Sequence, residues 1–102
     1  MSAPTPGNDQ AELNHKRARI SQIDAGILAL LDERMRLAIE IAKLKQETGK
    51  DIEDLERETQ LLGEILKHNR DTIIEDNRIA EIWSAIFQLS KDIQEQATSD
   101  AD

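Results

Sequence analysis

The sequence predicts an all-α protein, and three features of its composition support that fold class. With 102 residues and a mass of 11.5 kDa, the chain has room for one domain. Its hydrophobic residues, 38% of the total, are mainly Ile and Leu, whereas Val and Tyr are absent and aromatic residues reach only 2%. Gly and Pro are also few. Because strands favour β-branched and aromatic side chains, this composition favours helices over sheets.

The first predicted helix is the longest element and runs from about residue 11 to residue 47. Along it, apolar residues recur at alternating steps of three and four, which is the spacing of one helix face. This apolar stripe comprises Ile20, Ile23, Ile27, Leu30, Leu37, Ile41 and Leu44. Such a helix is roughly 55 Å long, whereas a globule of this size has a radius of gyration of about 13 Å. We therefore expect a partner chain to cover the stripe.

Two shorter helices are expected to follow the first, which Thr48 and Gly49 end. Asp51 can cap the second helix, which ends near Asn69. Its apolar face comprises Leu55, Leu61, Leu62, Ile65 and Leu66. The fold is thus predicted to be a three-helix protomer with one long and two shorter helices.

The third predicted helix begins at a possible capping box formed by Thr72 and Glu75 and extends to about Gln96. Its apolar face comprises Ile79, Ile82, Trp83, Ile86, Leu89 and Ile93, with Phe87 also expected in the core. Residues 1–10, which hold both prolines, are expected to be a disordered leader, and residues 97–102 a disordered tail. The helical domain then covers residues 11–96.

The charge and the residue inventory exclude several classes of function. Thirteen Lys and Arg residues against 21 Asp and Glu residues give a net charge of −8, which is the wrong sign for binding nucleic acid. With no Cys and only two His, the chain offers few metal ligands. No apolar run approaches the roughly 18 residues that span a bilayer, and residues 1–10 do not resemble a signal peptide. We expect no membrane association and a cytoplasmic location.

Two cations on the first helix point to the same side. Arg34 interrupts the apolar stripe between Leu30 and Leu37, and a buried guanidinium without an anion is costly. Lys45 follows eleven residues later, about 20° away around the helix axis. Together they could grip one small anionic ligand. Alternatively, Arg34 pairs with an acidic side chain of another helix and Lys45 extends into solvent at the helix end.

Further polar residues stand at notable positions on the two shorter helices. Asp54, Arg57 and Glu58 lie on nearly the same face of the second helix and, taken alone, fit a solvated intrahelical group. On the third helix, Ser90 and Gln94 replace apolar residues near the end of the inward face. Either they point hydrogen-bonding groups toward the core, or the helix is leaving the core there.

Taken together, these positions resemble the all-helical chorismate mutases, a family of small dimeric enzymes encoded alone or fused to prephenate enzymes. The resemblance covers about three quarters of the chain and needs no gap between Arg17 and Gln94. It is carried by the segments 17–24, 30–34, 41–45 and 54–58, with Ser90 and Gln94. Eight polar positions in one register across three helices make the match specific.

The resemblance implies an isomerase that converts chorismate to prephenate in Phe and Tyr biosynthesis, without metal or cofactor. Such an enzyme restrains a dianion in its compact conformation and stabilises the charge that grows on the ether oxygen. By similarity, Arg17 of the partner chain and Arg34 bind the substrate carboxylates, supported by Arg57 and Ser90. The remaining implied contacts are Lys45 and Gln94 to the ether oxygen, and Glu58 and the backbone around Asp54 to the ring hydroxyl.

The resemblance also implies an intertwined homodimer with two active sites, and the spacing of the cations agrees with it. Arg17 and Lys45 are 28 residues apart, roughly 42 Å along a helix, which is too far to touch one small molecule within a single chain. If two copies of the long helix run antiparallel and cross near Leu28, Arg17 of one copy comes level with the Arg34–Lys45 interval of the other.

Two alternative functions remain open at this point. An isochorismate-pyruvate lyase shares this fold and cationic pocket, although the lyases carry an apolar residue at the place of Glu58. A non-enzymatic helical dimerisation module would explain the stripe and the acidity. It would not explain why Arg34, Ser90 and Gln94 replace apolar residues in matching register.

Overall fold

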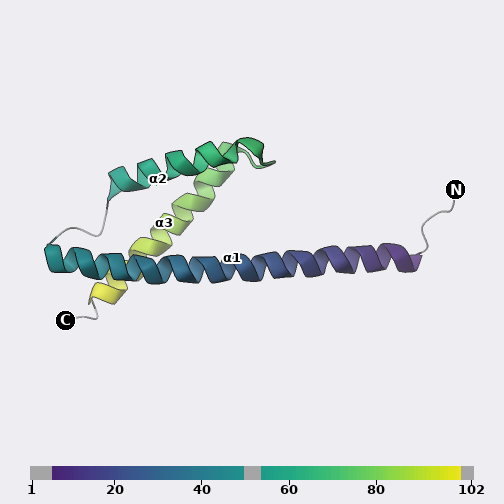
Figure 1. Ribbon diagram of the computed structural model, residues 1–102, viewed down its shortest axis with the longest axis horizontal. Coiled ribbons are helices and arrows are strands. Elements are labelled where there is room, and N and C mark those ends of the chain that lie inside the picture. Colours follow the sequence, from purple (N-terminus) through teal and green to yellow (C-terminus); the bar gives the residue numbers. More distant parts are fainter. Residues whose placement is uncertain (1–5, 50–53, 100–102) are drawn as a thin grey trace. The chain divides into compact units, whose positions relative to one another are not determined.

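The protein is all-α, as the sequence predicts. The computed structural model describes residues 6–49 and 54–99, and within these ranges it contains no strand. The helices are α1 (Pro6–Thr48), α2 (Leu55–His68) and α3 (Asp76–Ser99), and the short 3-10 helix η1 (Asn69–Asp71) joins the last two (Figure 1). The chain divides into two units, Met1–Arg34 and Met35–Asp102. None of the described helices has an apolar stretch long enough to cross a membrane.

The ends of α1 follow from its proline and its glycine. The helix begins at Pro6 rather than near residue 11, and proline suits a first turn because its missing N–H would have no partner within the helix. At the other end, Gly49 adopts a φ of 76°, and its N–H donates to the carbonyl of Gln46 at 3.3 Å. Since the left-handed region favours glycine, Gly49 ends α1 where the sequence predicts.

Helix α2 is capped by Asp54. Its carboxylate accepts a hydrogen bond from the Arg57 backbone N–H at 3.0 Å, which satisfies one of the donors that a helix start leaves without a partner. Asp51, the cap that the sequence suggests, lies outside the described residues. The predicted end of the helix near Asn69 is confirmed, because α2 ends at His68.

The capping box predicted for α3 is wrong. Backbone N–H groups of Arg78 and Ile79 donate to the Glu75 carbonyl, so Glu75 immediately precedes the helix. Thr72 instead donates its hydroxyl to Asn69 and accepts a hydrogen bond from the backbone N–H of Ile74 at 3.2 Å. The Asn69 amide nitrogen also donates to the carbonyl of Ile74 and to the carboxylate of Asp76. Thr72 is therefore hydrogen-bonded to Asn69 within the turn and does not cap α3. Helix α3 continues to Ser99, beyond the expected end near Gln96.

The buried apolar residues of the second unit lie on the last part of α1 and on helix α3. They are Met35, Ala38 and Ala42 on α1, with Ile79 and Phe87 on α3. Helix α2 leads through η1 into α3, contacts α3 and contributes side chains that are half-buried (Figure 1). Leu37 and Ile41, which belong to the apolar stripe, are exposed. The face of α1 that packs within the chain is therefore not the apolar stripe.

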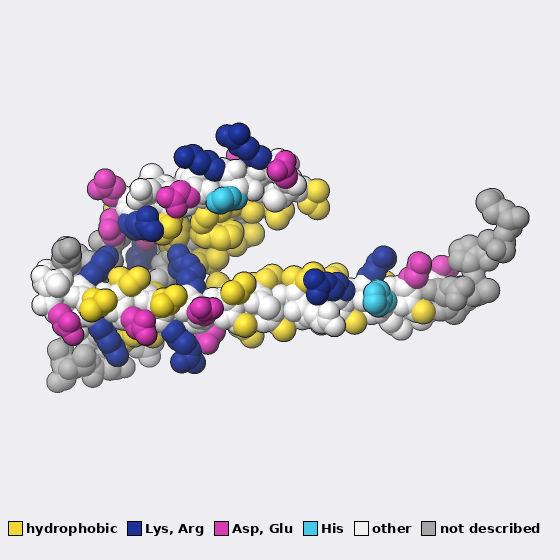
Figure 2. All heavy atoms as spheres, in the orientation of Figure 1, with side chains coloured by type: hydrophobic (Ala, Val, Ile, Leu, Met, Phe, Trp, Pro, Cys, Tyr) yellow, Lys and Arg dark blue, Asp and Glu magenta, His cyan; other side chains and the backbone are white. Residues whose placement is uncertain are grey.

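The described part of the first unit is a helix whose side chains are exposed. From Asp9 to Leu30 every residue is exposed, including the stripe residue Ile20 at 58% and Leu28, which follows the stripe residue Ile27, at 69%. Apolar side chains are visible along this stretch of α1 in Figure 2. The predicted periodicity is confirmed as helical, and the apolar residues that it marks between Asp9 and Leu30 are exposed within the described residues.

Candidate functional site

Gln94 is the buried polar residue of the second unit. Only 8% of it is exposed, and its side-chain Nε2 donates to the backbone carbonyl of Ala38 at 2.9 Å. Ala38 and Ala42 are both small, so they let α3 approach the α1 backbone closely enough for this bond. The prediction that Gln94 points inward is confirmed; the alternative, that α3 has left the core by this point, is wrong.

An ion pair joins α2 to α3 beside Gln94. The ammonium Nζ of Lys91 lies 3.3 Å from Oε1 of Glu58, and the two side chains are 21% and 23% exposed. Lys91 stands three residues before Gln94 and four after Phe87, so it lies on the inward face of α3. Glu58 therefore points toward the α3 side of α2 rather than into solvent.

The remaining predicted residues of the second unit lie on, or directly before, the same three helices as the Gln94 hydrogen bond and the Lys91–Glu58 ion pair. Lys45 follows Ala42 by one turn and is half-buried, and Ser90 is half-buried one turn before Gln94. Asp54 and Arg57 meet at the start of α2, where the first caps the helix through the backbone of the second. The exposed Arg57 guanidinium also donates to Oε1 of Gln60 at 3.2 Å.

The two other predicted residues lie on α1 in the unit Met1–Arg34. Arg17 is exposed, and Arg34, the last residue of that unit, is half-buried. Both positions are helical, as the sequence predicts. Their predicted role in binding carboxylates depends on a second copy and on the substrate, and it stays a prediction.

Two residues near this site were not singled out by the sequence analysis. Ala38 orients Gln94 through its carbonyl, a backbone group that no side-chain pattern reports. Lys91 could have been found, because its spacing from Phe87 and Gln94 marks it as a cation on an apolar face. Its pairing with Glu58 could not have been found, since that contact depends on how α2 packs against α3.

These residues include the chemical groups that suit an anion that also carries a hydroxyl. Ammonium, amide and hydroxyl groups from Lys45, Gln94 and Ser90 are hydrogen-bond donors, and the Glu58 carboxylate is an acceptor. Among the described residues, no three His, Cys, Asp or Glu side chains are grouped so that they could hold a metal ion.

Comparisons with known proteins identify the family. The model of the family "Chorismate mutase type II" matches residues 16–95, a range that contains all eight predicted site residues. A chorismate mutase of Methanocaldococcus jannaschii is 32% identical over 80 residues, which is 78% of this chain and 81% of that protein. The bifunctional chorismate mutase/prephenate dehydratase of Enterobacter agglomerans is 42% identical over 74 residues, but the match covers only 19% of its length.

A solved structure agrees with the sequence matches. The chorismate mutase (Form II) of Thermus thermophilus superposes with a TM-score of 0.77 at 31% identity, covering 82% of this chain and 94% of that one. The similarity is therefore one of structure as well as of sequence. The chain belongs to the chorismate mutase type II family.

Proposed function

We propose that the chain catalyses the rearrangement of chorismate to prephenate, with its own side chains as the only catalytic groups. The observation that carries this proposal is the buried Gln94 amide, held on the Ala38 carbonyl at 2.9 Å. A buried, oriented amide is a preorganised donor for an oxygen that gains negative charge. The reaction is unimolecular and requires no nucleophile, so donors and restraint suffice for it.

The ether oxygen of chorismate is the atom at which charge develops as its bond to carbon breaks. Lys45 and Gln94 donate to this oxygen in our assignment. The Gln94 Nε2 carries two hydrogens, and the bond to Ala38 uses one of them, which leaves the second for the substrate. The bond to Ala38 also fixes the plane of the amide, so the donor needs no reorganisation when the transition state forms.

The rest of the site restrains the substrate in its compact conformation. Arg34 and the Arg17 of a second copy bind the two carboxylates, because the planar guanidinium matches a carboxylate with two parallel hydrogen bonds. Arg57 and Ser90 support the same end of the substrate. Glu58 accepts a hydrogen bond from the ring hydroxyl, near the backbone at Asp54.

A second copy of the chain completes the site in this proposal. Helix α1 leaves the stripe residues Ile20, Ile23 and Ile27 about half exposed, at 58%, 44% and 51%. Exposed apolar surface along a helix favours burial against another helix. An isologous homodimer covers both copies of the stripe at once and lets Arg17 reach the site of its partner.

The direct test is to mix the purified protein with chorismate and to follow the loss of its ultraviolet absorbance. Acceleration with prephenate as the product supports the proposal. Isochorismate, supplied separately, tests the lyase alternative: release of pyruvate from it, with no action on chorismate, would overturn our assignment. No acceleration with either substrate would favour a non-enzymatic dimerisation module.

We place this step in Phe and Tyr biosynthesis. The relatives that join a chorismate mutase to a prephenate dehydratase support this placement, since their second activity acts on the product of the first. The cytoplasmic location inferred from the sequence stays a prediction.

A further inference from the structure

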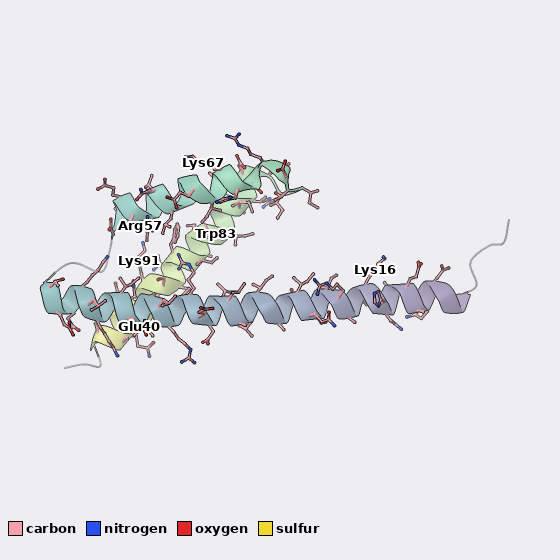
Figure 3. The ribbon with its side chains drawn as sticks, viewed as in Figure 1. Lys16, Glu40, Arg57, Lys67, Trp83 and Lys91 are labelled. Carbon is pink, nitrogen blue, oxygen red and sulfur yellow. The ribbon has the colours of Figure 1, made fainter. Side chains whose placement is uncertain are left out.

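The ion pair between Lys91 and Glu58 links the two helices that carry the proposed acceptor and the proposed amide donor. Lys91 precedes Gln94 by one turn on α3, and Glu58 follows Arg57 on α2; Figure 3 labels Lys91 and Arg57 on their helices. Both partners are about four-fifths buried, at 21% and 23% exposure. This burial sets the pair apart from the exposed bridge between Arg78 and Glu81 within α3, where both side chains are more than 60% exposed.

A carboxylate is an unfavourable group in a site that binds a dianion. Glu58 would repel both substrate carboxylates, and partial burial weakens the solvent screening that would otherwise limit that repulsion. A cation held against Glu58 removes this cost, because the pair presents no net charge to the substrate. The Lys91 ammonium, 3.3 Å from Oε1, is in the position to do this.

The pair also restricts where Glu58 can point. A Glu side chain has several rotatable bonds, but once one carboxylate oxygen is held in place, the second carboxylate oxygen has few possible positions. With Oε1 held by Lys91, Oε2 remains to accept the hydrogen bond of a ring hydroxyl. The lysine thus acts on the substrate through the carboxylate and not by direct contact.

We propose that Lys91 is a positioning residue for the rearrangement of chorismate: it orients Glu58 toward the ring hydroxyl and offsets its charge. This inference rests on the proposed function and extends it to a residue outside the eight assigned above. The alternative is an ordinary ion pair between helices, which would contribute to stability and leave catalysis unaffected.

The test compares Lys91→Met with Lys91→Arg and with Lys67→Met, a matched change at an exposed lysine of α2 that Figure 3 also labels. We expect Lys91→Met to raise KM for chorismate by on the order of tenfold, with a smaller fall in kcat, because the uncompensated carboxylate weakens dianion binding. Added salt should lower this KM by screening the repulsion. Lys91→Arg should return KM to within about threefold of the wild-type value, since it restores the cation.

The second arm repeats Lys91→Met in a Glu58→Gln background. If Lys91 acts through the carboxylate, the neutral amide needs no compensation, and the effect of Lys91→Met on KM should shrink to less than about twofold. An undiminished effect would mean that Lys91 contacts the substrate itself and would overturn the proposal. Should Lys91→Met not fold, as judged by circular dichroism, Lys91→Gln takes its place in both arms.

The wild-type protein separates this inference from the function on which it rests. An active wild type whose Lys91→Met variant matches Lys67→Met overturns the positioning role and leaves the proposed function intact. A wild type that does not accelerate the loss of chorismate overturns both.

Discussion

At the scale of single residues, Gln94 combines deep burial with a polar end. The amide is 8% exposed and bonded to the Ala38 carbonyl, so its desolvation is offset within the chain. An amide is also a donor at every pH, whereas a carboxylic acid donates only when protonated. The wild-type kcat should therefore change little between pH 5 and 7, and a sharp loss in that interval would contradict the role of Gln94.

Replacing the amide with an acid should make the reaction dependent on acid. In Gln94→Glu, the ionised side chain repels the charge that grows on the ether oxygen, while the protonated one donates to it. Because a Glu side chain in water ionises at about pH 4.3, we expect kcat of the variant to be low at pH 7.5 and to rise as the pH falls. The measurement is kcat from pH 4.5 to 8 for both proteins; parallel profiles would count against the assignment.

Lys45 is the cation assigned to the same oxygen. Lys45→Met keeps a side chain of similar length but removes the ammonium, and kcat for chorismate should fall by on the order of 10²–10³. Lys43→Met, two residues away at an exposed position of α1, is the matched control and should keep kcat within about twofold. Equal activity of the two variants would remove Lys45 from the mechanism.

At the scale of elements, the start of α2 depends on one side chain. Asp54 accepts the Arg57 backbone N–H at 3.0 Å, so Asp54→Ala should lower the free energy of unfolding by about 1 kcal/mol. Asp54→Asn, which keeps a capping oxygen, should lose much less. Urea denaturation of the three proteins measures both changes, and equal losses in the two variants would show that the cap contributes little.

A substitution at Gly63 should stabilise the same helix instead of destabilising it. It is exposed in the middle of α2, and a Cβ placed there would meet nothing within 4 Å. Gly63→Ala should therefore raise the free energy of unfolding by ~0.5–1 kcal/mol, because alanine loses less backbone entropy in a helix. A lower denaturation midpoint would instead indicate that another chain packs against this position.

The helices were predictable from the sequence because their apolar residues repeat with a helical period. The packing between the helices was harder to predict from the sequence. Ala38 and Ala42 form part of the core, yet alanine is common on every helix face and marks none. Thr72 and Glu75 have the spacing of a capping box, but Asn69, three residues earlier, competes for the threonine hydroxyl. Local spacing cannot decide such a competition.

In the candidate site too, positions on single helices were predictable from the sequence, whereas contacts between helices were not. The place of Gln94 after an apolar row left two interpretations open, and its burial confirms that the side chain points inward. The pairing of Glu58 with Lys91 joins residues 33 positions apart, so it depends on the packing of two helices and not on any local pattern. The roles toward the substrate came from the resemblance to a family, and they await the variants described above.

At the scale of the whole molecule, the proposed homodimer makes a prediction about mixed variants. Arg17→Ala and Lys45→Ala each remove one group from both sites of a homodimer, so each protein alone should be almost inactive. In a mixed dimer, one site receives Arg17 and Lys45 from different chains and is complete, while the other lacks both. Refolding the two variants together in equal amounts should restore about a quarter of the wild-type activity.

The mixing experiment has an internal control. Two variants altered at the same position, for example Lys45→Ala and Lys45→Met, cannot form a complete site in any combination and should remain inactive when mixed. If Arg17 served its own chain, the Arg17→Ala and Lys45→Ala mixture would recover nothing either. Sedimentation of each protein should show a dimer, and a monomeric wild type would remove the basis of the proposal.

The exposed side chains from Asp9 to Leu30 also bear on how the protein acquires its structure. A helix gains most of its stability from packing, and the side chains of this stretch are exposed in the described part of the structure. Its folding should then be bimolecular, with a refolding rate that rises with protein concentration. In the proposed homodimer, meeting a second copy would be the last step by which a newly synthesised chain acquires its active structure.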